Sequence, residues 1–196
     1  MKLFLLLAGA LASTSAHAVE FGQVQADKST VSFVSKQMGV PVNGFFKRFN
    51  AQLKFDPAKP ETAKTRVEIE LASIDAGSTE ANDEVVGKDW FHVRNFPAAV
   101  FESKSVKALG GGKFEVRGAL TIKGKNRDVV AISGFREEGK AGVFEGGFVL
   151  KRLDFGIGEG PWGDPGTVAD EVQIRFKLVT SPAAPVATAP VKAKSK

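Results

Sequence analysis

The chain has 196 residues, enough for one ordinary domain, and 43% of them are hydrophobic and 25% charged, as in globular proteins. It contains no cysteine, which excludes disulfides, thiolate metal sites and a lipid anchor on an N-terminal cysteine. The formal net charge is +5. Without Lys2 and the three lysines of the C-terminal tail, the chain has 23 basic and 22 acidic residues and is nearly neutral. A nucleic-acid-binding domain would carry a concentrated positive charge, so this class is not expected.

The N-terminal sequence predicts export. Met1-Lys2 is followed by the apolar run LFLLLAGALAS and then by Ala16-His17-Ala18, which is typical of a cleaved signal peptide over residues 1–18. The apolar run is too short to span a membrane as a permanent helix. We therefore expect a mature chain that begins at Val19, in the periplasm and without a lipid anchor.

Eight strands are predicted in the middle of the chain. Apolar and polar residues alternate in RVEIELASI, KFEVRGALTIK and EVQIRFKLV, and turn signals such as DPAKP and GGG separate the runs. The alternation predicts that Ile69 and Val116 face inward and that Arg117 faces outward. Eight antiparallel strands with one apolar face close into a barrel or stack as a sandwich, and closure removes exposed edges. The strands are expected near residues 29–35, 41–55, 65–74, 98–108, 113–123, 127–136, 141–151 and 170–180.

An irregularity is predicted within the second of these strands. In NGFFKRFNAQLKF, Phe46 and Phe49 are three residues apart, and the alternation resumes afterwards with the opposite parity. This shift indicates a bulge near Lys47-Arg48 that bends the strand around a corner.

One helix is predicted, between about Thr79 and Gly87. Ser78 or Thr79 can cap its first turn, and the acidic residues that follow suit the positive end of a helix. Trp90, Phe91 and Phe96 come directly after it. These aromatic residues either plug one end of a barrel or pack as ordinary core.

The segment LDFGIGEGPWGDPGTVADEV, from Leu153 to Val172, predicts a long loop because it contains five glycines and two prolines. It also contains the apolar residues Phe155, Ile157 and Trp162. A compact loop that packs its own side chains, with Trp162 on the outer wall, is one interpretation. The other is a cover over the mouth of a hollow barrel, with the Trp162 indole N–H directed to water or to a polar head group.

Catalytic and metal-binding groups are scarce. His92 is the only histidine after export, which excludes a multi-histidine metal site, and no nucleophile elbow or phosphate-binding loop is present. Glu159, Asp164, Asp170 and Glu171 are candidates for paired carboxylates, although solvated turn residues are the plainer interpretation. We therefore predict no catalytic residues, no metal and no cofactor.

Five segments carry a resemblance to a known family through their order and spacing: VNGFFKRFNAQLKFDP, VEIELASID, VGKDWFHVRNFPAAVFES, GALTIKGKNRDV and KRLDFGIGEGPWGDPGTVADEVQIRFKL. Together they resemble the YceI-like family of exported lipid-binding proteins. The resemblance covers Val19 to Val179 and implies a lipocalin-like antiparallel barrel that holds a polyisoprenoid in the periplasm, such as a polyprenyl chain or an isoprenoid quinone. Many relatives carry an H-x-G pattern where this chain reads Gln37-Met38-Gly39. Gln37 can donate a hydrogen bond but cannot become a cation, so the head-group preference is open.

The predicted barrel interior is apolar. An eight-stranded barrel is just wide enough to be filled by side chains or to hold one slender ligand, and sixteen Phe without any Tyr favour a dry interior and a long apolar ligand. The residues expected to contact the ligand are Phe33, Phe46, Leu53, Phe55, Val67, Ile69, Leu71, Trp90, Phe91, Phe101, Phe114, Val116, Leu120, Ile122, Phe155 and Trp162.

The sequence thus predicts an all-β, eight-stranded antiparallel lipocalin-like barrel with one short helix over residues 19–180, which binds or carries an isoprenoid lipid without catalysis. Two alternatives stay open: a filled barrel that serves as a ligand-free stress or interaction module, and a lipid- or sugar-acting hydrolase that uses the loop acids and His92. Residues 181–196 predict a disordered tail, either inert or in weak contact with anionic surfaces. A homodimer is compatible with the sequence, and no nucleic-acid partner is expected.

Overall fold

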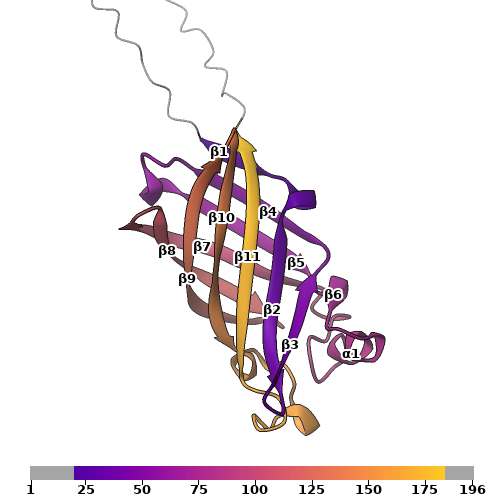
Figure 1. Cartoon of the computed structure of the whole chain (residues 1–196). Helices are drawn as coiled ribbons and strands as arrows, with labels where there is room; N and C mark the ends of the chain where they lie inside the picture. The colour runs from indigo at the N-terminus through magenta and orange to yellow at the C-terminus, as the bar shows by residue number, and fades with distance from the viewer. Residues whose placement is uncertain (1–19, 184–196) are drawn as a thin grey trace, which may run out of the picture.

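The computed structural model describes residues 20–183. The predicted signal peptide, residues 1–18, and most of the predicted tail lie outside the described residues. Within them the chain is mostly strand, with one α-helix and five short 3-10 helices (Figure 1). The strands are β1 (Phe21–Val24), β2 (Thr30–Gln37), β3 (Val40–Phe46), β4 (Phe49–Phe55), β5 (Lys64–Glu70), β6 (Ile74–Asp75), β7 (Ala98–Gly110), β8 (Lys113–Ile122), β9 (Lys125–Glu138), β10 (Ala141–Lys151) and β11 (Glu171–Pro182). The helices are α1 (Thr79–Val85), η1 (Ala26–Lys28), η2 (Pro60–Thr62), η3 (Leu71–Ser73), η4 (Arg152–Phe155) and η5 (Gly160–Trp162).

The strands close into an eight-stranded antiparallel barrel, as predicted. The ring runs β1-β4-β5-β7-β8-β9-β10-β11, and β11 pairs again with β1. Val24 lies opposite Thr180 across this closing pair. The same edge of β11 pairs with β2 nearer its start, from Gln173 to Lys177, and β3 and β6 continue the wall from β2. The sandwich alternative is therefore wrong.

Three details of the strands differ from the prediction. The first is β1, which was not predicted, although it closes the ring and its Phe21 is only 2% exposed. The second is at Lys47-Arg48, where the expected bulge is an interruption that separates β3 from β4. The Lys47 N–H donates to the carbonyl oxygen of Ser73 at 3.0 Å, and the Arg48 N–H donates to Ser73 Oγ at 3.0 Å. This break lies beside η3, which separates β5 from β6. The β3–β4 segment and the β5–β6 segment are therefore interrupted at neighbouring positions. At the C-terminal end, β11 continues to Pro182, past the predicted start of the tail at residue 181.

The helix α1 begins as the sequence predicts. Its N-cap is Ser78, whose hydroxyl accepts a hydrogen bond from the Ala81 N–H at 3.1 Å. The helix ends at Val85, two residues before the predicted Gly87, and the Phe91 N–H donates back to the Val85 carbonyl at 3.0 Å. Within residues 20–183, no helix has the length and hydrophobicity that crossing a membrane requires.

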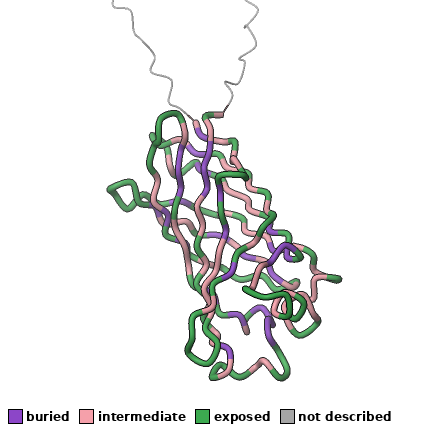
Figure 2. The backbone as a smooth tube through the Cα atoms, turned by 45° about the vertical axis from the view of Figure 1, so that its right-hand side comes forward, coloured by how far each residue is buried: buried purple, intermediate pink, exposed green. Residues whose placement is uncertain are grey.

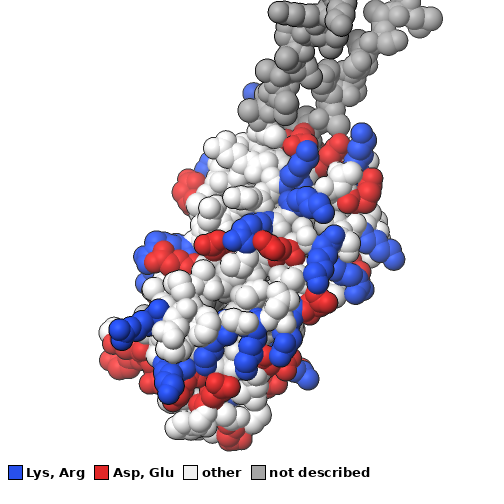
Figure 3. Space-filling view, turned by 180° about the vertical axis from the view of Figure 1, so that it is seen from behind, with Lys and Arg blue, Asp and Glu red and all other residues white. Residues whose placement is uncertain are grey.

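The two ends of the barrel differ. The end near both termini is filled by five phenylalanines whose ring centroids lie 4.8–5.3 Å apart. The opposite end carries α1 and the segment between β10 and β11 (Figure 1). Figure 2 shows buried residues alternating with exposed ones along the strands, and Figure 3 shows both signs of charge interspersed over one face. The five phenylalanines, called here the phenylalanine cluster, are Phe21, Phe55, Phe114, Phe135 and Phe144.

Candidate ligand-binding cavity

The barrel is hollow. A cavity of about 570 Å³ lies within it, bounded by residues of the phenylalanine cluster and by Trp90 and Trp162 towards the opposite end. This volume is within the range of small-molecule sites in proteins. The ligand-free alternative assumed a barrel filled by its own side chains, and the cavity shows that the barrel is not filled.

The cavity wall is almost entirely apolar. The inward residues of each strand repeat every second position, as in β8 with Phe114, Val116, Leu120 and Ile122. Away from the covered end, the lining has two polar residues, Thr65 near the start of β5 and Ser133 within β9. The other polar residues of the lining belong to α1, the ends of β2 and β10 or the loop regions: Ser35, Gln37, Glu80, Glu84, Trp90, Arg152 and Trp162.

Fifteen of the sixteen residues predicted to contact a ligand line this cavity. The exception is Phe155, which is 2% exposed and belongs to the buried core beside the cavity. In β10 every second side chain faces inward, but this alternation ends where η4 begins at Arg152. Phe155 therefore does not continue the cavity wall. Contact with a ligand stays a prediction for all sixteen. Those in the lining are Phe33, Phe46, Leu53, Phe55, Val67, Ile69, Leu71, Trp90, Phe91, Phe101, Phe114, Val116, Leu120, Ile122 and Trp162.

The loop between β10 and β11, residues 152–170, covers one end of the cavity. Trp162 lies in the cavity lining beside Trp90, with ring centroids 5.7 Å apart, and not on the outer wall. Its indole N–H donates to Glu84 Oε1 at 2.8 Å, which ties the loop to α1. The prediction that this N–H points to water or a head group is therefore wrong, whereas the covering position agrees with the structure.

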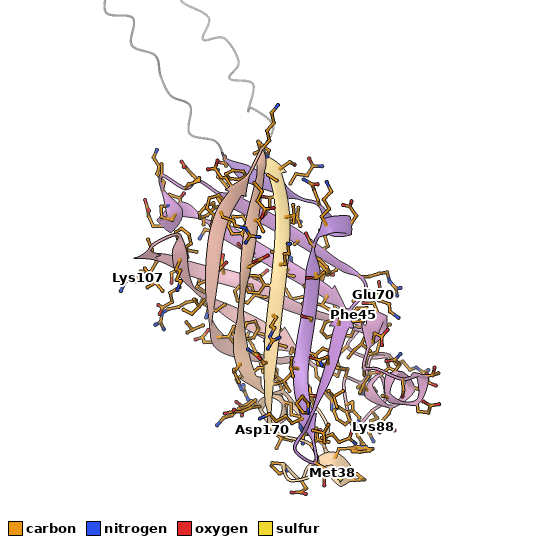
Figure 4. The ribbon with its side chains drawn as sticks, in the orientation of Figure 1. Met38, Phe45, Glu70, Lys88, Lys107 and Asp170 are labelled. Atoms are coloured by element: carbon orange, nitrogen blue, oxygen red, sulfur yellow. The ribbon has the colours of Figure 1, made fainter. Side chains whose placement is uncertain are left out.

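The turn between β2 and β3 holds the same loop from another side. The Met38 N–H donates to the Thr167 carbonyl at 2.9 Å, and the Ala169 N–H donates to the Lys36 carbonyl at 2.9 Å. Figure 4 shows Met38 and Asp170 at this end of the molecule. The cover is thus fastened to β2, the β2–β3 turn and α1.

A buried arginine organises the loop from within. Arg152 is 1% exposed, and its guanidinium donates five hydrogen bonds of 2.7–3.1 Å to backbone carbonyls of the loop. Burial lowers the pKa of this guanidinium, and the charge of Asp170 acts in the opposite direction. Its Cζ also lies 5.8 Å from the centre of the Trp90 ring. The accepting carbonyls are those of Ile157, Gly158, Trp162, Val168 and Ala169.

Sequence reasoning missed Arg152, although the sequence contained a signal. Phe148, Leu150 and Arg152 have the same parity in β10 and its continuation, so the alternation places an arginine on the inward face. A buried guanidinium needs acceptors for its five N–H groups. A glycine-rich loop that follows directly can fold back and offer its carbonyls.

The acidic residues proposed for a hydrolase have structural partners instead. Asp164 accepts hydrogen bonds from the Gly166 and Thr167 N–H groups at 3.1 Å, and these bonds, with the Thr167 hydroxyl, lower its pKa. Asp170 Oδ1 accepts from the Leu153 N–H at 3.0 Å, and Glu159 pairs with Lys123 at 3.3 Å.

None of these acids lines the cavity. Glu171 is exposed, and His92 packs edge-on against Phe96 at 5.9 Å, away from the lining. Across residues 20–183, no three His, Asp or Glu side chains gather in a way that could hold a metal ion. The loop acids and His92, on which the hydrolase alternative was built, therefore do not meet in the cavity.

The sequence of this chain matches a known domain family and several relatives. The family model of the YceI-like domain matches residues 23–180. A UPF0312 protein of Ectopseudomonas mendocina is 33% identical over 183 residues, covering 89% of this chain and 93% of the relative. A UPF0312 protein of Azotobacter vinelandii is 37% identical over 138 residues, covering 67% of this chain and 69% of the relative.

Solved structures share the fold. The crystal structure of Burkholderia cenocepacia BcnA is 46% identical, with a TM-score of 0.78 over 80% of this chain and 99% of that one. A polyisoprenoid binding domain from Saccharophagus degradans, implicated in plant cell wall breakdown, has a TM-score of 0.64 over 85% of this chain and 100% of that one. At 15% identity, the second likeness concerns the fold alone.

Proposed function

The chain belongs to the YceI-like family, and we propose that its barrel binds one polyisoprenoid lipid, such as a polyprenyl chain or an isoprenoid quinone. The observation that carries this proposal is the apolar cavity of about 570 Å³, bounded at one end by the phenylalanine cluster and covered at the other by Trp162. The relative from Saccharophagus degradans is described as polyisoprenoid binding, which agrees with the proposal.

The chemistry of the wall supports a long apolar chain over a polar metabolite. A polar molecule would lose its hydration inside the barrel and find few partners away from the covered end, because Thr65 and Ser133 are the only polar residues of the lining there. A hydrocarbon chain leaves water at a gain proportional to its buried area. The polar residues of the lining lie mostly towards the covered end, which suits a ligand with one polar head.

We further propose that the protein carries this lipid in the periplasm and performs no catalysis on it. The first part rests on the signal-peptide pattern of residues 1–18, and the second on the structural partners of the loop acids. Intact-mass measurement of protein exported by its native host tests the location. A chain that starts at Val19 supports export and cleavage, and a chain that keeps residues 1–18 contradicts them.

A cavity-filling variant tests the binding site. Ala131 of β9 is 4% exposed and lines the cavity, whereas its neighbour Val130 is 42% exposed on the outer face. Ala131→Phe puts a phenyl ring into the cavity, and Val130→Phe puts the same ring outside.

Each delipidated protein is titrated with a menaquinone of four isoprene units, which quenches nearby tryptophans. Ala131→Phe should weaken binding at least tenfold, and Val130→Phe should bind like the wild type. Equal affinity in the two variants, or no binding by the wild type, contradicts the proposal.

A further inference from the structure

The cavity reaches solvent beside its cover. Of the described residues in the cavity lining, three are exposed: Gln37, Glu80 and Glu84. Gln37 is the last residue of β2, and the two glutamates belong to α1. The mouth of the cavity therefore lies between the β2–β3 hairpin and α1.

The hairpin leaves an open backbone edge at this mouth. Along one edge β3 pairs with β2, whereas on its other edge β6 pairs with Phe45 and Phe46. Within residues 20–183, no strand pairs with this second edge from Val40 to Gly44. Figure 1 shows β3 on the side of the barrel where α1 lies. Passage of a ligand between the hairpin and α1 therefore breaks no strand pairing.

The tip of the hairpin is apolar and continues the inward face of the wall. Met38 is 75% exposed and Val40 is 64% exposed, and Figure 4 shows Met38 at the covered end of the molecule. Val40 has the same parity in β3 as Val42 and Phe46, which line the cavity. Apolar residues thus follow one face of β3 from the cavity to the exposed tip.

Met38 also has a backbone conformation that suits other residues better. Its φ is 48° and that of Gly39 is 80°, and two positive φ values are typical of the type I′ hairpin turn, which favours Asn-Gly. A bulky residue other than glycine is uncommon in this region, and such residues cluster at functional sites. The exposed apolar side chain and the unfavourable φ both indicate that a partner covers Met38.

We propose that the tip of the β2–β3 hairpin, Met38 and Val40, inserts into the surface of a lipid bilayer, and that the bound isoprenoid moves directly between bilayer and cavity through the adjacent mouth. This inference rests on the proposed lipid-binding function and adds the partner surface to it. Release into water would expose the whole apolar chain, at a free-energy cost proportional to its area. Direct transfer at the bilayer surface avoids that cost.

The charges around the mouth favour apolar insertion over electrostatic attraction. Glu80 and Glu84 lie at the mouth, and Lys36 and Lys88 are exposed at the same end, where Figure 4 shows Lys88. Charges of both signs give little net attraction to an anionic surface. The contact should therefore form on zwitterionic vesicles and persist at high salt, which screens exposed charges.

Site-specific labelling tests the contact, because the chain has no native cysteine. Met38→Cys and the control Leu109→Cys are each labelled with an environment-sensitive fluorophore. Leu109 is also exposed and apolar, but its neighbour Ala108 pairs with Phe114 of the phenylalanine cluster, so the control lies at the opposite end of the barrel. On phosphatidylcholine vesicles with spin-labelled acyl chains, the label at position 38 should be quenched at low and at high salt. The label at position 109 should not be quenched.

A transfer assay connects this contact to function. A menaquinone of four isoprene units moves from the loaded protein to phosphatidylcholine vesicles that contain a fluorescent lipid, which the quinone quenches. The wild-type rate should rise with vesicle concentration. Met38→Asn should slow transfer about tenfold, the effect of removing one apolar side chain from the contact, and Leu109→Asn should transfer like the wild type. Because Met38→Asn gives the preferred Asn-Gly turn, the variant should fold and bind the quinone like the wild type.

The outcomes distinguish this inference from the proposed function. An unquenched label at position 38, a wild-type rate that does not depend on vesicle concentration, or an equal rate for Met38→Asn overturns the inference and leaves lipid binding intact. Dimerisation in solution that Met38→Asn abolishes, without contact with vesicles, assigns the tip to a second copy of the chain and overturns the inference as well. A wild type that binds no menaquinone contradicts lipid binding itself.

Discussion

Replacing Arg152 with methionine should loosen the cover of the cavity. The substitution keeps an unbranched apolar side chain of similar length but removes the five donors that bind the carbonyls of residues 157, 158, 162, 168 and 169. These carbonyls lie in both halves of the loop. Loss of the five hydrogen bonds therefore releases both halves at once.

The magnitude follows from two opposing contributions. Hydrogen bonds from a charged donor contribute about 1.5–3 kcal/mol each, and five are lost. Removal of the guanidinium also relieves a desolvation penalty of several kcal/mol, and opening of the loop hydrates the freed carbonyls. We expect a net loss of about 3–5 kcal/mol in the free energy of unfolding, a decrease in Tm of roughly 6 to 20 °C for a domain of this size.

Thermal unfolding and hydrogen exchange measure this effect. Arg175→Met is the control, since Arg175 is exposed on β11 and its Nη2 bonds only to Gln173 Oε1. Amides of residues 153–170 should lose protection in Arg152→Met and keep it in Arg175→Met. An unchanged Tm together with unchanged exchange in the loop would refute the organising role of Arg152.

Three further predictions concern the wall and the loop. Val116→Asp should destabilise the fold by several kcal/mol, or the new carboxylate should bind a proton, because Val116 lines the cavity. Arg117→Asp should change the stability little, because Arg117 is exposed. Similar losses of Tm in the two variants would show that the inward and outward faces are misassigned. In Trp90→Phe, Trp162 is the only tryptophan left, and an isoprenoid quinone added to delipidated protein should quench it; unchanged emission at saturation would place the loop away from the ligand. Hydrogen bonds from Gly166 and Thr167 lower the pKa of Asp164. The Asp164 carboxylate therefore stabilises the loop fully above the ordinary carboxyl pKa, and this stabilisation is lost as the pH falls through the lowered pKa. The protection of amides around Asp164, taken relative to their intrinsic exchange rate at each pH, should therefore decrease in acid, and Asp164→Ala should remove this pH dependence. A wild-type profile in the variant speaks against it.

The barrel wall was predictable because local patterns determine it. Alternation in a strand such as β8 assigns the inward face without knowledge of its neighbours, and Ser78 marks the start of α1 through its own side chain. The strand β1 has only four residues, FGQV, with one clear apolar anchor. It forms because β4 and β11 leave a gap that it can pair with on both sides, and these strands are distant in sequence.

The covered end was only partly predictable, because long-range polar partners decide it. The loop's composition indicated a cover, but the partner of Trp162 is Glu84, 78 positions away in the sequence. Phe155 was placed on the wall by strand phase, which ends where η4 begins.

Native mass spectrometry of the protein purified gently from its host tests the central claim most directly. The wild type should carry one bound isoprenoid lipid per chain, released by organic solvent and identified by its fragments, and Ala131→Phe should carry none or far less. A wild type observed only without ligand, or with a bound molecule that is not an isoprenoid, contradicts the account.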